Sequence, residues 1–466
     1  MKRRPAIPAG PYLVVGLARS GVAAARALRA RGAQVIGLDS SAFAAAEALR
    51  AEGVEVFLDA DDVPGLLERV RAVVKSPGVP AQAPTIAVAR ERGVPVLGEL
   101  ELAWRLLENE FVAVTGTNGK TTTVELIGHI HREAGLPVAV AGNVGTALSS
   151  LVGELDRRAT VVCDASSFQL EDTLAFAPEA AALLNVTPDH LDRHGTLEAY
   201  TAAKLEVFAR QSAEDVAVYP AELAERIAPA GGADPIPGAA RRVAFGWDAS
   251  AALFELDGEL WWGARPLLSL AELRLRGRHN VENAMAAAAV CLARGVDAEA
   301  VRAGLASFHG VAHRLEEVAE LGGVLYVNDS KATNVASTLV ALDAFAGRPL
   351  HLILGGQGKG QDFASLREPV QRECAGVYVI GEHAATIASA LAKIAPPVLE
   401  CGELDRAVAC ARAAAEGDAD AGSAVARASD RGPVVLLSPA CASFDQFVDY
   451  EARGAAFRAL VEEMEV

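Results

Sequence analysis

The stretch from residue 111 to residue 130 constrains the fold more than any other part of the chain. It starts as an apolar, β-branched run, FVAVT, and turns at Gly116 and Gly119 just before Lys120. Three threonines and the helix-like run VELIGHI follow. A strand, a glycine turn and a helix start in this order form a cradle whose backbone N–H groups and helix N-terminus attract phosphate. We therefore predict a nucleoside triphosphate site here.

The spacing of this motif departs from the standard Walker pattern. That pattern has a glycine five residues before Gly119, where this chain has Val114, and the first glycine here is Gly116. Lys120 is placed to reach the terminal phosphates, and the Thr121 hydroxyl to hold Mg²⁺. The alternative is an ordinary strand-to-helix turn that contains glycine and lysine. We favour the phosphate cradle because the required strand and helix flank the motif.

Length and charge limit the class of protein. At about 150 residues per domain, a chain of 466 residues accommodates about three domains. Because 51% of the residues are apolar and 22% are charged, we expect packed domains. The formal net charge of −17 argues against nucleic acid or an anionic membrane as a partner. We expect small-molecule substrates, held in local pockets, and a monomer.

The sequence also predicts the compartment. The apolar run near the N-terminus is interrupted by Arg19 and lacks a cleavage-type site, so it is not a secretory signal. No apolar stretch reaches the ~18 residues that a membrane-spanning helix needs. The six cysteines form no C-x-x-C pair, and most lie in apolar runs, as buried free thiols do. We expect a cytoplasmic protein without membrane insertion.

The first 97 residues look like a small α/β unit. A strand, a turn with a glycine at each end, an Ala-rich helix and a second strand lie between residues 12 and 38 and precede Asp39. This order follows the dinucleotide-binding plan, in which a carboxylate at the place of Asp39 binds ribose. The turn reads G-x-x-x-x-G instead of G-x-G-x-x-G, which favours a nucleotide other than NAD. The alternative is a plain Rossmann-like turn.

Polar clusters follow three strand-like runs of the second unit, at 138–141, 160–163 and 180–184. Asp164 ends the second run, and His190 lies in the cluster after the third. Ligands gather at the carboxyl ends of parallel strands, so we expect these clusters to converge on the phosphate loop. Asp164 and His190 are then candidate Mg²⁺ partners, directly or through water. Taken singly, each residue is more often a cap or a satisfied core residue.

Helical and turn patterns in the same unit add further candidates. Lys204 lies on a helical run and, by itself, reads as a solvated side chain. Asn280 and Asn283 are three residues apart and share one helix face. Asp257 and Gly258 separate two strand-like runs and predict a β-hairpin.

Residues 311–466 look like a third α/β unit, because polar clusters again follow apolar runs. One of these clusters, GGQGK, ends at Lys359 and follows a strand-like run. It is not interpreted as a second phosphate loop, because no threonine-capped helix follows. We interpret Lys359 as a contact for an acidic small-molecule substrate; the alternative is a surface lysine in a glycine-rich loop.

The assembled motifs resemble the Mur ligase family, and the similarity extends nearly end to end. The matching segments are GTNGKTT, SSFQL, NVTPDHLD, His279-Asn280, His313-Arg314, NDSKATN and SPACASFDQF. The last two are similar to the members that add D-glutamate to UDP-N-acetylmuramoyl-L-alanine. The resemblance implies an α/β protein of three domains. They are a Rossmann-like UDP-sugar-binding domain over 1–97, a central P-loop-type mononucleotide-binding domain for ATP over 98–310, and a Rossmann-like amino-acid-binding domain over 311–466.

The resemblance implies ATP-dependent amide formation in peptidoglycan precursor synthesis. The substrate carboxylate attacks the γ-phosphate of ATP, and the amine of D-glutamate then displaces phosphate from the acyl phosphate. A carboxylate that attacks a triphosphate brings like charges together, so cations and loop amides must neutralise them. Lys120 and Mg²⁺, with two ions expected, fit this demand.

The resemblance also assigns roles to individual residues. The catalytic residues are Lys120, His190 and Lys204. The metal ligands are Thr121 for one Mg²⁺, and Asp164, His190 and a carbamylated Lys204 for the second. The ATP contacts are Gly116, Thr117, Asn118, Gly119, Lys120, Thr121, Thr122, Asn280, Asn283, Arg314, Asp329 and Lys331. The UDP-sugar contacts are Ser20, Asp39, Ser40 and Asn143. The D-glutamate contacts are Thr333, Lys359, Ser443, Phe444 and Tyr450.

Four positions depart from the family pattern. Asp164 stands where the family usually has glutamate, so its metal contact is expected to pass through water. Phe444 and Tyr450 stand where this kind of member more often has leucine and phenylalanine. Ala18 replaces a commoner glycine in the first turn, and the Arg19 guanidinium is placed to compensate by reaching the phosphates.

Two other functions remain open at this point. A folate polyglutamate ligase shares the fold and the ATP chemistry, but the separate N-terminal nucleotide domain argues against it. A nucleotide switch or scaffolding protein would hydrolyse ATP only to change shape, and would release ADP whatever the acceptor amino acid.

Overall fold

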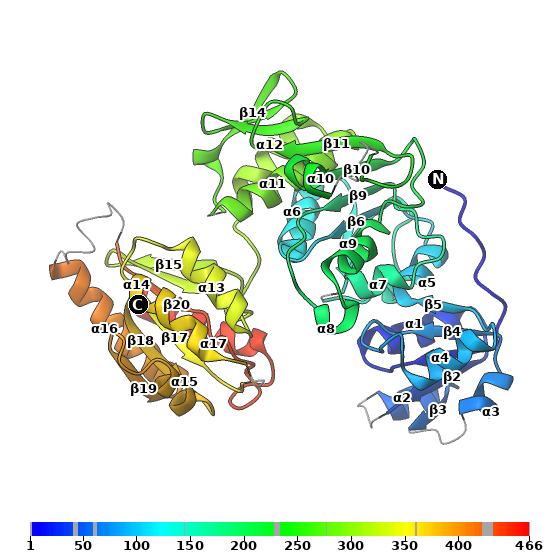
Figure 1. The fold of residues 1–466 in the computed structure, drawn as a ribbon, viewed down its shortest axis with the longest axis horizontal. Coiled ribbons are helices and arrows are strands. Elements are labelled where there is room, and N and C mark those ends of the chain that lie inside the picture. The colour runs from blue at the N-terminus through cyan, green and yellow to red at the C-terminus, as the bar shows by residue number, and fades with distance from the viewer. Residues whose placement is uncertain are drawn as a thin grey trace. The chain divides into compact units, whose positions relative to one another are not determined.

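The computed structural model describes residues 2–40, 45–58, 63–143, 145–227, 234–275, 277–358, 361–421 and 432–465. The chain forms two compact units, Met1–Phe308 and His309–Val466 (Figure 1). No helix of the described ranges is both long enough and apolar enough to cross a membrane.

The first unit begins with a five-stranded parallel sheet in the order β3-β2-β1-β4-β5. This order, with the first strand central, confirms the predicted dinucleotide-binding plan. The helix after the first strand starts at Arg19, inside the glycine turn. The elements are β1 (Tyr12–Val15), α1 (Arg19–Ala30), β2 (Val35–Asp39), α2 (Ala46–Ala51), β3 (Glu55–Leu58), α3 (Val63–Glu68), β4 (Ala72–Lys75), α4 (Pro84–Glu91) and β5 (Val96–Gly98).

A second, nine-stranded sheet carries the phosphate loop, in the order β14-β13-β12-β11-β10-β9-β6-β8-β7. Its strands are β6 (Phe111–Thr115), β7 (Val138–Gly142), β8 (Thr160–Asp164), β9 (Ala180–Leu183), β10 (Val216–Pro220), β11 (Arg241–Gly246), β12 (Leu253–Leu256), β13 (Glu259–Trp262) and β14 (Arg265–Ser269). Its helices are α5 (Glu99–Leu106), α6 (Lys120–Glu133), α7 (Ser167–Glu171), α8 (Leu191–His194), α9 (Leu197–Leu205), α10 (Ala221–Ile227), α11 (Arg278–Ala293) and α12 (Ala298–Ser307).

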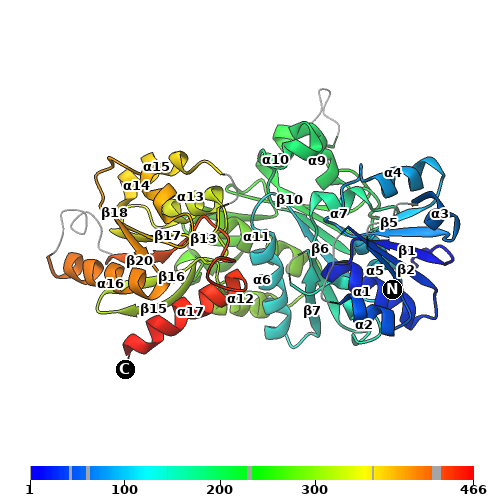
Figure 2. The ribbon, with the colours of Figure 1, turned by 90° about the horizontal axis from the view of Figure 1, so that it is seen from below.

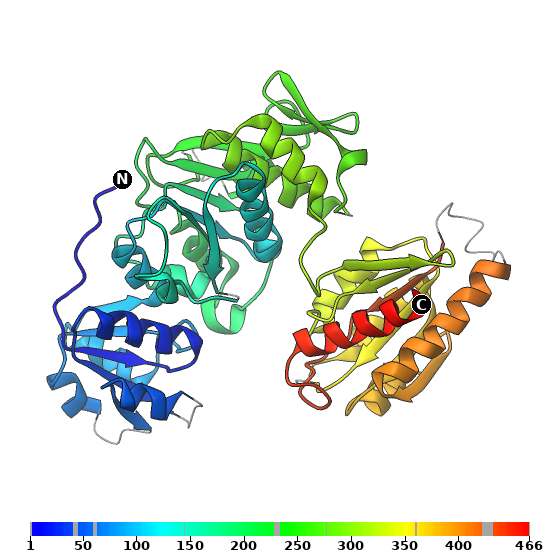
Figure 3. The same ribbon diagram turned by 180° about the vertical axis from the view of Figure 1, so that it is seen from behind.

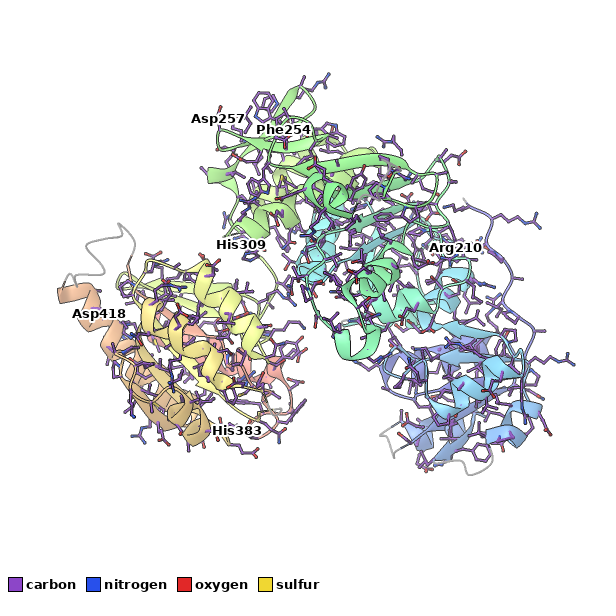
Figure 4. The ribbon with its side chains drawn as sticks, in the orientation of Figure 1. Arg210, Phe254, Asp257, His309, His383 and Asp418 are labelled. Atoms are coloured by element: carbon purple, nitrogen blue, oxygen red, sulfur yellow. The ribbon has the colours of Figure 1, made fainter. Side chains whose placement is uncertain are left out.

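The position of β6 in this sheet decides where the site lies. β6 is fully buried and pairs in parallel with β8 on one side and β9 on the other. β7 pairs in parallel with β8, so the ends of β7, β8 and β9 lie at the same edge of the sheet as the phosphate loop, as predicted. α6 packs against α11, and the two helices lie side by side (Figure 2). The predicted hairpin is also present, with Asp257 at its tip between β12 and β13 (Figure 4).

An N-terminal arm before β1 binds the domain of the larger sheet. The Lys2 ammonium lies 2.6 Å from the Asp215 carboxylate. The Arg4 guanidinium donates to the carbonyl of Trp104 at 2.7 Å and lies 5.0 Å from the ring centroids of both Trp104 and Phe111. These contacts attach the chain before the first sheet to the core of the second.

The second unit is a six-stranded sheet in the order β15-β16-β20-β17-β18-β19, parallel except for β15. Helices α13 to α15 contribute to the core on one face, and α16 and α17 to the core on the other (Figure 3). The elements are β15 (Glu316–Leu321), β16 (Val324–Asn328), α13 (Val335–Ala344), β17 (Leu350–Gly355), α14 (Arg367–Glu373), β18 (Cys374–Ile380), α15 (Ala384–Ala390), β19 (Val398–Gly402), α16 (Leu404–Ala421), β20 (Val434–Leu437) and α17 (Tyr450–Glu462).

Candidate active site

The loop between β6 and α6 has the geometry of a phosphate cradle. Gly116 has a φ of +154° and Gly119 a φ of +86°, which favour glycine. A Cβ on Gly119 would overlap the Oδ1 atom of Asn283 on α11, so the close approach of the two elements also requires glycine. Among the described side chains, none caps α6 at Gly119. The first N–H groups of the helix are thus left for an anionic ligand.

The segment after β9 braces this loop. The Thr117 N–H donates to the Asn185 carbonyl at 3.0 Å, and the Asn118 N–H to the Asn185 side-chain oxygen at 2.9 Å. The Asn185 amide donates back to the Asn118 carbonyl at 3.1 Å. The Thr187 N–H donates to the Thr117 hydroxyl at 3.1 Å. The neighbouring strand end therefore holds the shape of the phosphate loop.

Two lysines share one carbonyl oxygen of the loop. Lys120 Nζ donates to the Gly116 carbonyl at 2.6 Å and to the Thr117 carbonyl at 2.8 Å. Lys204 Nζ donates to the same Gly116 carbonyl at 2.8 Å and lies 4.3 Å from the Tyr200 ring centroid. Lys204 and Lys120, 84 positions apart in the chain, thus both reach this loop.

Lys204 is buried, with 1% of its surface exposed, so the solvated side chain expected from its helical run alone is wrong. A helical pattern shows which residues share a face, but not which neighbouring element covers that face. Burial, with a smaller contribution from the charge of Lys120, lowers the pKa of Lys204 to about 7, against the opposing charge of Asp189. Near neutral pH, a large fraction of Lys204 is therefore an uncharged amine.

His190 belongs to an aromatic cluster beside Lys204. It has a φ of 52° and precedes α8, and its half-exposed ring lies 5.0 Å from Phe168 and 6.3 Å from Tyr200, centroid to centroid. The Tyr200 hydroxyl lies 3.3 Å from the Thr117 hydroxyl. The cluster thus connects His190 to the phosphate loop.

The sequence analysis missed His194, which lies in the same cluster. Its ring stacks on Phe168 at 5.3 Å, and its Nε2 lies 3.0 Å from the Ser167 hydroxyl. Burial lowers the pKa of His194, and Glu171, 3.2 Å away, opposes this shift. The spacing of His190 and His194, four residues apart at a helix start, was the available signal.

Asp164 ends β8 as a buried carboxylate. A Cβ on Gly142 would overlap the Oδ1 atom of Asp164. The Asn143 N–H donates to the Asp164 carbonyl at 3.3 Å. Burial raises the pKa of Glu125 on α6, with Arg132 opposing the rise and Asp164 adding to it. Glu125 is a second carboxylate of this edge that the sequence analysis did not single out.

The residues at this edge fit a Mg²⁺ site that ATP and water complete. The predicted ligands Thr121, Asp164, His190 and Lys204 come from α6, the end of β8, the start of α8 and α9. Within the described ranges, no group of three or more His, Cys, Asp or Glu side chains is arranged to hold a metal ion. Mg²⁺ usually keeps several waters and substrate phosphates and needs only one or two protein carboxylates. The donor set is therefore suitable, and the ligand roles stay a prediction.

Asn280 and Asn283 both lie on α11 and are buried. The Asn283 amide donates to the Asn280 side-chain oxygen at 3.1 Å, which confirms that they share a face. Because Asn283 also lies against Gly119, this face of α11 meets the phosphate loop.

The predicted UDP-sugar contacts all lie in the first unit. Ser20 is in the first turn of α1, Ser40 follows β2, and Asn143 follows β7. The Asp39 carboxylate accepts a hydrogen bond from the Leu17 N–H in the glycine turn. The Arg19 guanidinium, predicted to reach phosphates, donates to the Gly145 carbonyl at 3.2 Å, and so connects this turn to the loop that carries Asn143.

In the second unit, Asp329 follows β16 and is almost fully buried. It accepts hydrogen bonds from the Ser438 hydroxyl at 2.8 Å and from the Leu315 N–H at 3.2 Å. Burial raises the pKa of Asp329 to about 7, against these bonds and the opposing charge of Arg314. Asp329 thus supports the loop between β16 and α13, which carries Lys331 and Thr333.

The remaining predicted residues of this unit differ in exposure. Lys331 Nζ donates to the Tyr450 hydroxyl at 2.7 Å. Ser443 is buried, whereas Phe444, its neighbour, is 65% exposed. Lys359 lies outside the described residues.

Three family models match the chain in order. They are the Mur ligase MurD-like N-terminal domain at residues 11–98, the Mur ligase middle domain at 114–291 and the Mur ligase glutamate ligase domain at 313–441. Together they match most of the sequence.

Two curated relatives are similar over nearly the full length. The protein of Anaeromyxobacter dehalogenans is 45% identical over 97% of each chain. That of Acidobacterium capsulatum is 42% identical over 96% of this chain and 95% of the relative. Both are named UDP-N-acetylmuramoylalanine--D-glutamate ligase.

Solved structures show the same fold at lower identity. UDP-N-acetylmuramate-alanine ligase from Thermotoga maritima is 20% identical, with a TM-score of 0.58 over 98% of this chain and 99% of that one. A MurF ligase from the same organism, in complex with ADP, is 18% identical, with a TM-score of 0.54 over 98% and 96%. With three family models in order and relatives above 40% identity over nearly the whole length, this chain belongs to the Mur ligase family.

Proposed function

We propose that this chain is an ATP-dependent ligase that joins D-glutamate to UDP-N-acetylmuramoyl-L-alanine in peptidoglycan precursor synthesis. The observation that carries the proposal is the phosphate loop with Lys120 and Lys204 on one carbonyl. The substrate assignment is supported by relatives named for this reaction at 38–45% identity. We also propose that the reaction takes place in the cytoplasm. The proposed domains span residues 1–97, 98–310 and 311–466.

In the first step, the substrate carboxylate attacks the γ-phosphorus of ATP. A bond forms between the carboxylate oxygen and the γ-phosphorus, the bond between the γ-phosphorus and the bridging oxygen breaks, and ADP leaves with that electron pair. Lys120 now binds the carbonyls of Gly116 and Thr117, and the phosphate oxygens of ATP are stronger acceptors for the same ammonium. Lys120 and the first N–H groups of α6 then neutralise the charge that develops. Bound Mg²⁺ would add charge neutralisation at the same phosphates.

In the second step, the amine of D-glutamate attacks the acyl carbon. The amide bond forms, inorganic phosphate leaves with the electrons of the C–O bond, and the nitrogen loses a proton. D-Glutamate carries two carboxylates, which lysine and hydroxyl donors such as Lys359, Thr333 and Ser443 suit. Phe444 and Tyr450 complete the proposed amino-acid contacts.

Lys204 is proposed to carry a carbamate. Its neutral amine attacks the carbon of CO₂, a nitrogen–carbon bond forms, and a proton is released. The pKa of about 7 supports this step, because only the neutral amine reacts. The adduct changes a cation beside Lys120 into an anion, which suits the second of two proposed Mg²⁺ ions, with Asp164 and His190 as its other ligands.

The decisive experiment measures phosphate release with a panel of amino acids, with and without UDP-N-acetylmuramoyl-L-alanine. We expect release only when this substrate and D-glutamate are both present, and little with L-glutamate or D-aspartate. Release of similar size with neither substrate would favour a nucleotide-driven switch. Dependence on a folate substrate instead would favour a folate polyglutamate ligase.

A further inference from the structure

The Tyr450 side chain contacts the Lys331 ammonium in two ways. Lys331 Nζ donates a hydrogen bond to the Tyr450 hydroxyl at 2.7 Å and lies 4.3 Å from the centroid of the Tyr450 ring. The oxygen lone pair and the aromatic ring thus act on the same cation. The two residues are 119 positions apart in the sequence, so the sheet of the second unit brings them together.

Tyr450 is itself held firmly. It is the first residue of α17, whose start is capped by Asp449 through a 2.7 Å bond from the Ala452 N–H. The buried Ser330 hydroxyl donates to the Tyr450 carbonyl at 2.8 Å. The His313 ring lies edge-on to the Tyr450 ring at 6.3 Å. A side chain that is fixed at its backbone and at its ring can fix the position of a flexible lysine.

Ser330 strengthens the link, because it directly precedes Lys331. The backbone of Lys331 is also held, since its N–H donates to the His313 carbonyl at 3.0 Å. Both ends of the lysine, its backbone and its ammonium, are therefore restrained by residues in contact with Tyr450. Without such restraint a lysine head group samples many positions, and ordering it on ligand binding costs free energy.

We propose that the Tyr450 hydroxyl is a positioning group for Lys331, so that Tyr450 acts on the nucleotide through this lysine and not mainly on D-glutamate. This inference rests on the proposed function together with the role predicted above for Lys331 as an ATP contact. Phenylalanine keeps the ring contact with the ammonium but lacks the hydrogen-bond acceptor. Tyr450→Phe therefore removes the hydrogen bond to Lys331 and keeps the ring.

The test separates nucleotide affinity from amino-acid affinity. For Tyr450→Phe we expect the KM for ATP, and the Kd for a non-hydrolysable ATP analogue by calorimetry, to rise about tenfold, as for a lost hydrogen bond to a charge. The KM for D-glutamate should stay within about twofold. The reverse pattern, a raised KM for D-glutamate with unchanged ATP values, would overturn the inference, and so would unchanged values for both.

A double-mutant cycle on the Kd of the same analogue shows whether Tyr450 acts through Lys331. In a Lys331→Met background, adding Tyr450→Phe should weaken binding by no more than about twofold, because the group to be positioned is absent. A further tenfold loss would show an independent role and reject the positioning role. Calorimetry gives this result even for variants with no turnover.

The matched control is Tyr378→Phe in the same unit. Tyr378 is buried, and its hydroxyl lies 3.1 Å from His351 Nδ1, so the change removes a comparable contact outside the candidate site. We expect its ATP analogue affinity to equal that of the wild type, and an equal loss would attribute the Tyr450 effect to general loosening. Wild-type phosphate release tests the proposed function separately, since it does not depend on Tyr450→Phe.

Discussion

Two lysines of the first unit are equally buried, at 1% exposure each, yet their surroundings differ in charge. Lys75 ends β4 in the smaller sheet and binds the Asp172 carboxylate after α7 at 2.7 Å. Lys204 lies under the phosphate loop, where the described residues give it a carbonyl, an aromatic ring and the nearby Lys120.

The difference shows that burial alone does not mark a functional lysine. The salt bridge to Asp172 makes Lys75 a link between the two sheets, because Asp172 belongs to the domain of the larger one. Its backbone carbonyl also accepts from the Gly98 N–H at 3.2 Å, so the pair lies at the junction. Among the described residues Lys204 forms no such salt bridge, the charge of Asp189 offsets its burial only in part, and desolvation drives it towards the neutral amine.

The largest effect is expected at Lys120. Its charge next to Lys204 is one difference between the surroundings of Lys204 and those of Lys75. Lys120→Ala should lower kcat about a thousandfold, because the charge at the γ-phosphate is no longer neutralised. ADP release in the presence of both substrates measures this. The circular dichroism spectrum should be unchanged, since the hydrogen bonds described for Lys120 are made to carbonyls of the loop and not to the core. Full activity of the variant would refute the phosphate-loop assignment.

Lys75→Met tests whether Lys75 has a structural role through its salt bridge to Asp172. Removing one partner leaves Asp172 buried with only the partly exposed Arg90, which lies 3.2 Å away. We expect the free energy of unfolding in urea to fall by about 3 kcal/mol. The kcat at saturating substrates, measured where the variant is fully folded, should match the wild type. A loss of kcat under those conditions would place Lys75 in the catalytic site instead.

Lys204→Ala tests whether Lys204 has a catalytic role through the proposed carbamate. We expect kcat to fall about a hundredfold, because an anion that orients the metal site is lost. Added acetate should restore part of the activity by supplying a carboxylate to the space left by the side chain. Lys75→Met serves as the control and should not respond to acetate. A fully active Lys204→Ala enzyme would exclude the carbamate.

The pH dependence of stability gives the smallest effect. The pKa of Lys204 is about 7 in the folded chain, against an ordinary 10.5. Between these values the unfolded chain binds more protons, so the free energy of unfolding rises with pH across this window. From pH 7 to pH 9 in CO₂-free buffer, the wild type should gain roughly 2 kcal/mol relative to Lys204→Met. A difference that stays constant or falls with pH would contradict the lowered pKa.

Sequence patterns predicted the central strands better than the edges of the sheets. The buried run of β6 is a continuous apolar segment, and its predicted bounds agree with the structure. β3, β15 and β19 were not predicted. They are edge strands with exposed and half-exposed residues, and a strand that contacts the core on so few positions leaves a weak apolar pattern.

The candidate site also has one part that the sequence predicted and another that it did not. The phosphate loop was predictable because its chemistry is local: two glycines with positive φ, a lysine and a helix start lie within five residues. The burial of Lys204, its shared carbonyl with Lys120 and the contact of Lys331 with Tyr450 were not. Each depends on which elements the sheets bring together.

The sequence by itself determined the order of the elements, the phosphate loop and the family, because periodicity and turn chemistry act between near neighbours. Only the tertiary structure decided which cations became desolvated and which found an anionic partner. Charge and dielectric depend on distance in space, and residues 88 positions apart, such as Gly116 and Lys204, come within 2.8 Å only when the sheet forms.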